Sequence, residues 1–408
     1  MRFPALQSKD FVHYTAGNTS AMTAIWINRV IIGWLGWEMT LSAGWVGLLA
    51  FFLFGPTLIA SPMFGVLIDR MDARKAGLIS QTTLAITILV LLILQLTGTL
   101  TIWGLAATSL AIGIITSADR TVRFVLVPRI VDKDALANAV SIHGINFNTA
   151  RLIGPAIGGL LIDIYGTDVA TMVNLVMGLP SIYILTQLKV RERNTPKGKK
   201  KPFFLEMLDG AIHAFSLPIV REAMILTTVL SLTARGVIEI LPAIADGVYG
   251  RGASGLGQML AAAGAGALLA AIMITIRRSG SSKRGIPVWA RISTSAGLIA
   301  MILLGIFQYW PLAMGLITVL GFCITNTGVD LQASIQLELG DDFRARVMSL
   351  WIVLVIGGAA LSSIMLGLIA DLVGMQYTLI GGGIVGLVLV VFANKLIRKF
   401  DADQSKTT

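Results

Sequence analysis

A few charged side chains stand inside long apolar stretches of this 408-residue chain. They are Arg29, Arg151, Arg235, Glu239 and, near the end of its stretch, Asp330. A charge facing lipid is costly, so such residues normally face a water-filled path or an oppositely charged partner. These five residues are therefore the first candidates for chemistry inside a membrane.

The pair of Arg235 and Glu239 is suited to proton transfer. Their spacing of four residues predicts that both lie on one face of a helix. An apolar surrounding favours the neutral form of a carboxyl group, and a neighbouring cation favours the charged form. A change in either influence can therefore make the carboxyl group take up or release a proton. Glu239 is the first proton-coupling candidate and Asp330 the second. The alternatives are a permanent ion pair at Glu239 and a solvated boundary residue at Asp330.

Other polar residues in the apolar stretches suit a solute-binding cavity. Guanidinium and amide donors bind anionic or hydroxylated solutes, and an indole ring supplies an apolar wall. The cavity candidates are Trp26, Asn28, Arg29, Asn146, Arg151 and Arg235. For Arg151, a role in bracing neighbouring helices is the alternative.

The run Gly154-Pro155-Ala156-Ile157-Gly158-Gly159 is unusual inside an apolar stretch. Proline removes a backbone donor and bends a helix, and glycines let another helix approach closely. We expect Gly154, Pro155, Gly158 and Gly159 to pack two helices tightly on the outer side and so to oppose leak. A general packing seam is the alternative.

The composition indicates an integral membrane protein. Apolar residues make up 55% of the chain and charged residues 13%, and the mean hydropathy is +0.81, which leaves too little polar surface for a soluble particle. With Cys323 as the only cysteine, no intrachain disulfide is possible. We interpret the net charge of +10 as a topology signal and a contact with anionic lipid, and do not infer nucleic-acid binding.

No enzymatic constellation is visible. His13, His143 and His213 lie in separate segments without cysteine or carboxylate companions at metal-ligand spacing. No phosphate-binding glycine loop with its lysine is present, so neither a cofactor nor ATP-driven pumping is expected.

Apolar runs of about 20 residues are long enough to cross a bilayer. Twelve are expected, which makes this an all-α membrane protein of two six-helix bundles. The runs are Val12 to Trp37, Trp45 to Ile68, Gly77 to Leu96, Thr101 to Ala118, Ala137 to Ile164, Val169 to Leu188, Val220 to Ala245, Gly255 to Ile276, Ile286 to Tyr309, Pro311 to Ala333, Val347 to Leu372 and Tyr377 to Ile397.

The predicted domains are an N-terminal bundle over 1–190, a linker over 191–216 and a C-terminal bundle over 217–408. The linker is rich in lysine and contains an expected surface helix at Phe203 to Phe215. When loops are assigned alternately, lysine and arginine gather in those on the side of both termini. Both termini are therefore expected in the cytoplasm.

The two halves repeat one another at an offset of 208 residues. Gly159 to Gly166 aligns with Gly367 to Gly374, Ser141 with Ser349, and the basic loop at Arg70 with that at Arg278. Parallel repeats of six helices are typical of rocker-type secondary transporters, with the solute bound near the midplane.

Several motifs resemble the major facilitator superfamily. The run Gly65 to Lys75 resembles its loop between helices two and three, G-x-L-x-D-R-x-G-R-K, although Asp72 and Ala73 depart from it. The run Gly154 to Gly159 resembles the antiporter motif of its helix five. Trp26 to Trp34, with Leu126 to Arg129, resembles the subgroup of enterobactin-type siderophore exporters and drug exporters.

This resemblance implies a proton antiporter that exports a siderophore-like or drug-like solute by alternating access from the bacterial cytoplasmic membrane, as a monomer. It also implies an inner gate formed by Gly65, Asp69, Arg70, Arg74 and Asp119, in which Asp69 contacts helix eleven. From their place at the inner end of helix four, Asp119 and Arg120 are expected to complete the pairing with Arg70 or Arg74, and an ordinary charged turn is the alternative. The alternatives are a transporter of lysophospholipid or another amphiphile, and a sensor or scaffold of the same fold that transports nothing.

Overall fold

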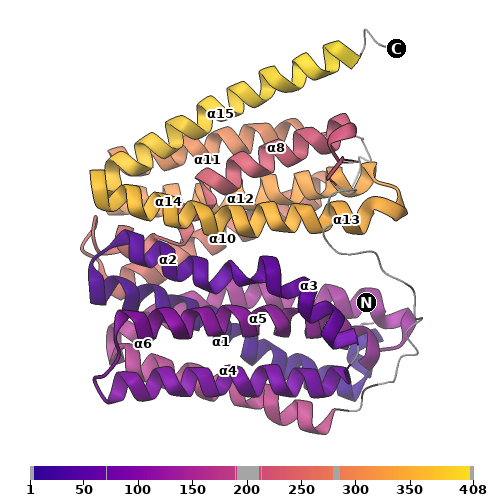
Figure 1. Cartoon of the computed structure of the whole chain (residues 1–408), viewed down its shortest axis with the longest axis vertical. Coiled ribbons are helices and arrows are strands. Elements are labelled where there is room, and N and C mark those ends of the chain that lie inside the picture. The colour runs from indigo at the N-terminus through magenta and orange to yellow at the C-terminus, as the bar shows by residue number, and fades with distance from the viewer. Residues whose placement is uncertain are drawn as a thin grey trace. The chain divides into compact units, whose positions relative to one another are not determined.

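The computed structural model describes residues 4–69, 71–188, 190, 211–212, 214–278 and 285–404. All regular structure in this part of the chain is helical (Figure 1). Most of the predicted surface helix at Phe203 to Phe215 falls outside the described residues, as does most of the lysine-rich linker.

The chain divides into two compact units. Unit 1 consists of Met1–Leu41, Phe52–Gly198 and Arg251–Ala261, and unit 2 consists of Ser42–Phe51, Lys199–Gly250 and Ala262–Thr408. Helices α2 (Ala43–Phe54) and α10 (Gly252–Arg278) each contribute residues to both units. The predicted boundaries at 190 and 217 remain a prediction.

Unit 1 is built on long helices, three of which begin at side-chain caps. Its main elements are α1 (Lys9–Thr40), α3 (Pro56–Asp69), α4 (Ala73–Leu96), α5 (Ile102–Ile130) and α6 (Leu136–Gln187). Ser8, Asp72 and Thr101 accept backbone N–H groups at the starts of α1, α4 and α5, which satisfies donors that have no partner inside a helix. In Figure 1, α4 runs beside α5.

Glycines mark equivalent helix ends in the two halves. Gly166 adopts φ 87° and divides α6 into two helices, and Gly374, which lies 208 residues later, adopts φ 92° at the end of α14 (Gly358–Val373). Only glycine adopts this backbone conformation without steric cost. The sequence repeat therefore corresponds to a repeat in backbone geometry.

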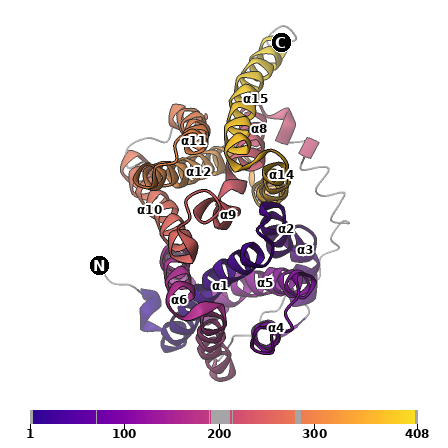
Figure 2. The same ribbon diagram turned by 90° about the vertical axis from the view of Figure 1, so that its left-hand side faces the viewer.

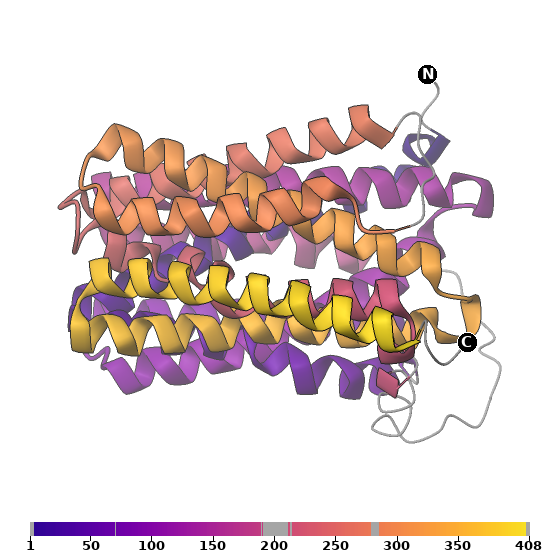
Figure 3. The same cartoon turned by 90° about the horizontal axis from the view of Figure 1, so that it is seen from above.

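Unit 2 contains the remaining helices. They are α8 (Pro218–Thr233), η3 (Arg235–Ile238), α9 (Leu241–Ala245), α11 (Val288–Ile306), α12 (Trp310–Glu338), α13 (Asp341–Ile352), η4 (Val353–Gly357), α14 and α15 (Met375–Gln404). Seen along the helix axes, α11 lies beside α12 (Figure 2), and α15 runs along α14 (Figure 3).

Eight helical stretches in the described part are long and apolar enough to cross a membrane. One of them, Asn138–Gln187, has 50 residues and a break at Gly166, so it provides two crossings. With α1, α5 and the interrupted segment from α8 to α9 added, the described helices supply twelve crossings. The predicted all-α membrane fold is confirmed.

Two details of the predicted crossings are wrong. The fourth was expected to end at Ala118, but α5 continues to Ile130. The seventh was expected as one helix from Val220 to Ala245, but α8 ends at Thr233 and a 3-10 turn follows. There the Ser362 hydroxyl donates to the Thr233 carbonyl at 3.3 Å. The break takes away the helical partner of this carbonyl, and a neighbouring helix supplies a donor instead.

The repeated glycines also make equivalent contacts. A methyl group on Gly159 would lie 2.5 Å from Gly257 Cα, within unit 1. Its counterpart Gly367 leaves similarly little room beside the backbone of Ala43, within unit 2. Glycine is therefore needed at both positions for helix backbones to touch.

The start of α2 is held by a carboxylate of unit 2. Asp371 accepts the Ser42 hydroxyl at 2.5 Å and the N–H groups of Ala43 and Gly44 at 2.8 and 3.0 Å. These donors open a helix whose dipole favours negative charge. Asp371 thus caps the first two N–H groups of α2, and Ser42 Oγ accepts the N–H group of Trp45 at 3.1 Å.

Candidate functional site

A cavity of about 410 Å³ lies inside unit 1. Its walls come from α1, the end of α2, α4, α5 and α6. A space of this size is in the range that holds a small organic molecule. Aromatic rings of Trp26, Phe54, Phe124 and Phe147 form much of its apolar wall.

The charged residues of this wall are mainly cationic. Among the described residues, Arg29, Arg120 and Arg123 line the cavity together with a single carboxylate, Asp119. Amide groups of Asn28, Gln81 and Asn174 and the ring of His143 add neutral polar groups. The wall therefore carries more positive than negative charge.

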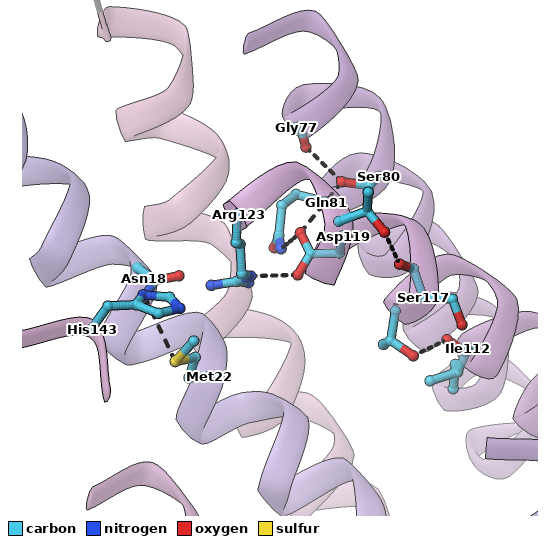
Figure 4. A network of polar contacts seen from close by, with 12 residues as sticks. Asn18, Met22, Gly77, Ser80, Gln81, Ile112, Ser117, Asp119, Arg123 and His143 are labelled. Atoms are coloured by element: carbon cyan, nitrogen blue, oxygen red, sulfur yellow. Dashed lines mark hydrogen bonds and ion pairs between the residues drawn. The ribbon is translucent and has the colours of Figure 1, made fainter. Parts of the chain in front are cut away.

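The Asp119 carboxylate is held in a buried network (Figure 4). Arg123 Nε donates to Asp119 Oδ2 at 2.6 Å, and both side chains are more than nine-tenths buried. Gln81 Nε2 and Ser80 Oγ donate to Asp119 Oδ1 at 2.6 and 3.3 Å. Because both carboxylate oxygens have donors, Asp119 has a fixed orientation.

The Arg123 guanidinium is not fully used by this network. Its Nη2 is buried and has no hydrogen-bond acceptor among the described residues. Figure 4 shows the guanidinium between Asp119 on one side and the pair of Asn18 and His143 on the other. Asn18 Nδ2 lies 3.4 Å from His143 Nδ1, and Asn18 Oδ1 also has no partner among the described residues.

Three of the predicted cavity residues do line the cavity, namely Trp26, Asn28 and Arg29. The Arg29 guanidinium lies 5.2 Å from the ring centre of Trp26 and 5.3 Å from that of Phe54, which is within the range of cation–π attraction. Asn28 Oδ1 accepts a hydrogen bond from Asn174 Nδ2 at 3.0 Å. The sequence candidates on α1 thus converge on one wall.

Two further candidates on α6 lie beside the cavity without lining it. The Arg151 guanidinium is 5.9 Å from the ring centre of Trp26. Asn146 is half-buried, and its Nδ2 has no hydrogen-bond acceptor among the described residues. Arg151 thus lies near the edge-to-face pair of Trp26 and Phe147, whose ring centres are 5.8 Å apart.

Arg235 and Glu239 lie in unit 2 at the interruption between α8 and α9. The expected α-helical spacing is absent here, because Arg235 starts a 3-10 turn and Glu239 caps it. A methyl group on Gly328 would lie 2.8 Å from Arg235 Nη2, so the guanidinium rests against α12. Both residues are half-buried.

Asp330 is buried in unit 2 and close to a cation. Its Oδ2 lies 3.4 Å from Arg277 Nη2, and Arg277 also donates to Asn326. Asn326 in turn donates to Ser293 at 2.9 Å. Asp330 is therefore part of an internal polar network of α10, α11 and α12, and not the solvated boundary residue that was the alternative.

The structure corrects the pairing expected for Asp119 and Arg74. Asp119 is bonded to Arg123, Gln81 and Ser80, while Arg74 donates to the carbonyl groups of Leu185 at 2.9 Å and Thr186. Asp119 is thus bonded to side chains of α4 and α5, and Arg74 to carbonyl groups at the end of α6. Of the other gate candidates, Arg70 lies outside the described residues, and for Gly65 and Asp69 only the place in the backbone of α3 is described.

The Gly154 to Gly159 run packs two helices together within unit 1. A methyl group on Gly154 would lie 2.6 Å from Trp26 Cβ, and one on Gly158 would lie 3.3 Å from Val30 Cβ. Gly159 faces α10 instead, at Gly257. The motif therefore brings α6 close to α1, and it fixes the helix that carries the cavity residues Trp26 and Arg29.

The sequence did not predict that Arg123, Gln81 and Asn174 line a cavity, and Arg120 was expected at the inner gate. The available signal was the spacing of Asp119 and Arg123, four residues apart within a run that stays apolar to Ile130. Because the fourth apolar run was ended at Ala118, Asp119 was expected at the inner end of its helix and was assigned to the gate. The amides of Gln81 and Asn174 are single polar residues in otherwise apolar helices, and only the fold brings them to the cavity.

Comparisons with known proteins agree on a transporter. A family model described as "Transmembrane secretion effector" matches residues 3–408. The staphyloferrin A transporter of Staphylococcus aureus is 21% identical over 367 residues, which are 86% of this chain and 87% of that protein. The enterobactin exporter EntS of Escherichia coli O9:H4 (strain HS) is 24% identical over 329 residues, 81% of this chain and 77% of that protein.

Solved structures of transporters share the fold. A bacterial homolog of the human lysosomal transporter Spinster, in an inward-facing and unoccupied conformation, superposes with a TM-score of 0.75 at 13% identity, covering 97% of this chain and 98% of its own. The nucleoside transporter NupG gives 0.72 at 15% identity, covering 96% and 99%. At these identities the likeness concerns the fold alone.

Proposed function

Because this chain belongs to the transmembrane secretion effector family of the major facilitator superfamily, a family of transporters, we propose that it exports a siderophore-like solute in exchange for protons. Transport of a small solute by a multi-pass membrane protein is the premise. The direction, the solute class and the coupling to protons are the proposal.

The observation that carries the proposal is the cavity of about 410 Å³ in unit 1, with three guanidinium groups and one engaged carboxylate in its wall. Cationic donors beside aromatic rings suit an acidic solute with ring or hydroxyl groups better than a cationic drug. The two relatives reported above are named for siderophores, which supports this solute class.

We propose that the two halves work by alternating access. The repeat supports this mechanism, since Gly166 and Gly374 end equivalent helices and Gly159 and Gly367 make equivalent backbone contacts. In transporters with such repeats, one half rocks against the other around the bound solute.

Proton coupling is assigned to Glu239 and Asp330. Both are carboxylates within membrane-crossing segments of unit 2, where a protein can use protonation to change its internal polar contacts. Asp330 has Arg277 as its cationic neighbour at 3.4 Å. Release of that neighbour on protonation would change the network that ties α10 to α12.

We also propose that the protein resides in the bacterial cytoplasmic membrane with both termini in the cytoplasm. The basic residues of the alternate loops support this orientation. A reporter fused to the C-terminus tests it: green fluorescent protein should fluoresce there, and alkaline phosphatase should stay inactive. The reverse pattern would contradict the orientation.

Transport by purified protein in proteoliposomes tests the main proposal. A panel of siderophores and cationic drugs is offered on the cytoplasmic face, with and without an inward pH gradient. We expect gradient-dependent transport of acidic siderophores. Transport at the same rate with and without the pH gradient would contradict proton antiport. Transport of cationic drugs alone would contradict the proposed class of solute.

A further inference from the structure

Two arginines of α5 are placed to recognise one chemical group of a solute. This inference rests on the proposed function and concerns the class of solute. Arg120 and Arg123 are three residues apart, and both line the cavity. Residues at this spacing are neighbours on a helix surface. Both arginines therefore belong to one helix face that lines the cavity.

The nearby carboxylate does not neutralise both. Asp119 Oδ2 accepts a hydrogen bond from Arg123 Nε, and Asp119 Oδ1 accepts hydrogen bonds from Gln81 and Ser80. Arg123 Nη2 is left without an acceptor among the described residues, although the side chain is nine-tenths buried. A buried donor without a partner costs free energy, so an acceptor at this point stabilises the site.

The geometry also orients the guanidinium. The bond to Asp119 holds Arg123 on one edge, and Figure 4 shows the group extending from there toward His143, another residue of the cavity wall. Arg120, by contrast, is exposed. A planar oxyanion matches guanidinium donors through charge-assisted hydrogen bonds.

We propose that Arg120 and Arg123 form the oxyanion subsite of the cavity and bind a carboxylate of the solute. The aromatic wall of Trp26, Phe54 and Phe147 then holds the apolar part of the same molecule. The solute is an organic acid with an aromatic or other flat apolar group.

The test is binding of matched acid and neutral probes to the purified full-length protein. 2-Hydroxybenzoate is compared with 2-hydroxybenzamide, which has the same ring and hydroxyl group but no charge, by isothermal titration calorimetry. The wild-type protein should prefer the acid. Arg120→Gln and Arg123→Gln should each raise the Kd of the acid by about 10- to 100-fold, the loss expected for a hydrogen bond to a charged group, and leave that of the amide within about twofold.

Folding is controlled in two ways. Arg120 is exposed, so Arg120→Gln removes the charge without leaving a buried group unpaired. The double variant Asp119→Asn/Arg123→Gln removes both members of the buried pair, and no uncompensated charge remains. The double variant Glu222→Gln/Arg291→Gln is the matched control, because it removes another ion pair, that of Arg291 with the buried Glu222, outside the cavity; it should keep the preference for the acid.

The outcomes separate this site from the proposed function. If neither arginine variant changes the preference for the acid, the subsite is overturned. If proteoliposomes transport the amide as readily as the acid, transport stands and the subsite is overturned. A protein that transports no small solute overturns both. Arginine-dependent binding of phosphatidylglycerol in nanodiscs, in place of the soluble acid, would assign the oxyanion to lipid and overturn the solute site.

Discussion

The Ser42 hydroxyl donates to Asp371 Oδ2 at 2.5 Å, although the two residues are 329 positions apart in the chain. The same carboxylate accepts the first two backbone N–H groups of α2. Asp371, a side chain of α14, therefore adds to a local cap of α2, in which Ser42 Oγ accepts the Trp45 N–H group at 3.1 Å.

Removal of this cap should destabilise the protein. We expect Asp371→Ala to cost about 0.5–2 kcal/mol, the usual cost of a lost helix cap, and to lower the midpoint of thermal unfolding of the purified protein. Asp371→Asn should cost less, because the amide oxygen still accepts one N–H group. Equal midpoints for Asp371→Ala and the wild type would contradict the capping role.

Gly154 should not tolerate even a small side chain. Gly154→Ala places a methyl group 2.6 Å from Trp26 Cβ, and we expect a loss of about 1–3 kcal/mol from overpacking. Gly315→Ala is the control, because nothing lies within 4 Å of its new methyl group and the exchange favours a helix by about 0.5–1 kcal/mol. Thermal unfolding of the two variants should shift in opposite directions.

Arg29 should contribute to solute affinity. Its guanidinium sits over Trp26 and Phe54 in the cavity wall, so we expect Arg29→Ala to raise the apparent KM for the transported solute by about tenfold, the effect of about 1.4 kcal/mol. Arg29→Lys keeps the positive charge and should retain part of the affinity. A variant that unfolds at lower temperature but keeps its KM would assign Arg29 to packing.

Glu239 and Asp330 can each be tested for proton coupling with its own variant. If Glu239 carries the proton, Glu239→Gln should abolish export driven by a pH gradient and leave solute-for-solute exchange intact. Asp330→Asn should do the same if Asp330 shares this role, and its contact with Arg277 should then be weaker. Gradient-driven export at the wild-type rate in either variant removes that residue from coupling.

The sequence predicted the helices better than the contacts between them. Apolar runs identify crossings because every bilayer-spanning helix must be apolar over a similar length. Gly154 and Gly158 were expected to admit a close helix, and α1 lies there. Trp26, Asn28 and Arg29 were expected at a central cavity between the two halves, and the structure places them in the wall of a cavity inside unit 1.

The remaining differences arise from tertiary structure. Gly236 and Pro242 are local signals of a break in the seventh crossing, but they do not specify that α8 ends at Thr233, where the hydroxyl of Ser362 on another helix binds the carbonyl. Arg74 satisfies carbonyl groups at the end of α6, which no motif in its own loop specifies. A charge motif predicts which residues need partners, and the fold decides which partners they find.

The excess of guanidinium over carboxylate groups in the cavity has a practical consequence for measurements. Inorganic anions of an assay buffer are attracted to the same wall and compete with an acidic ligand, and mobile ions also screen its long-range attraction. Apparent affinities should therefore weaken as phosphate or chloride is added. Values obtained in buffers of different anion content describe different competitions and can be compared only at matched composition.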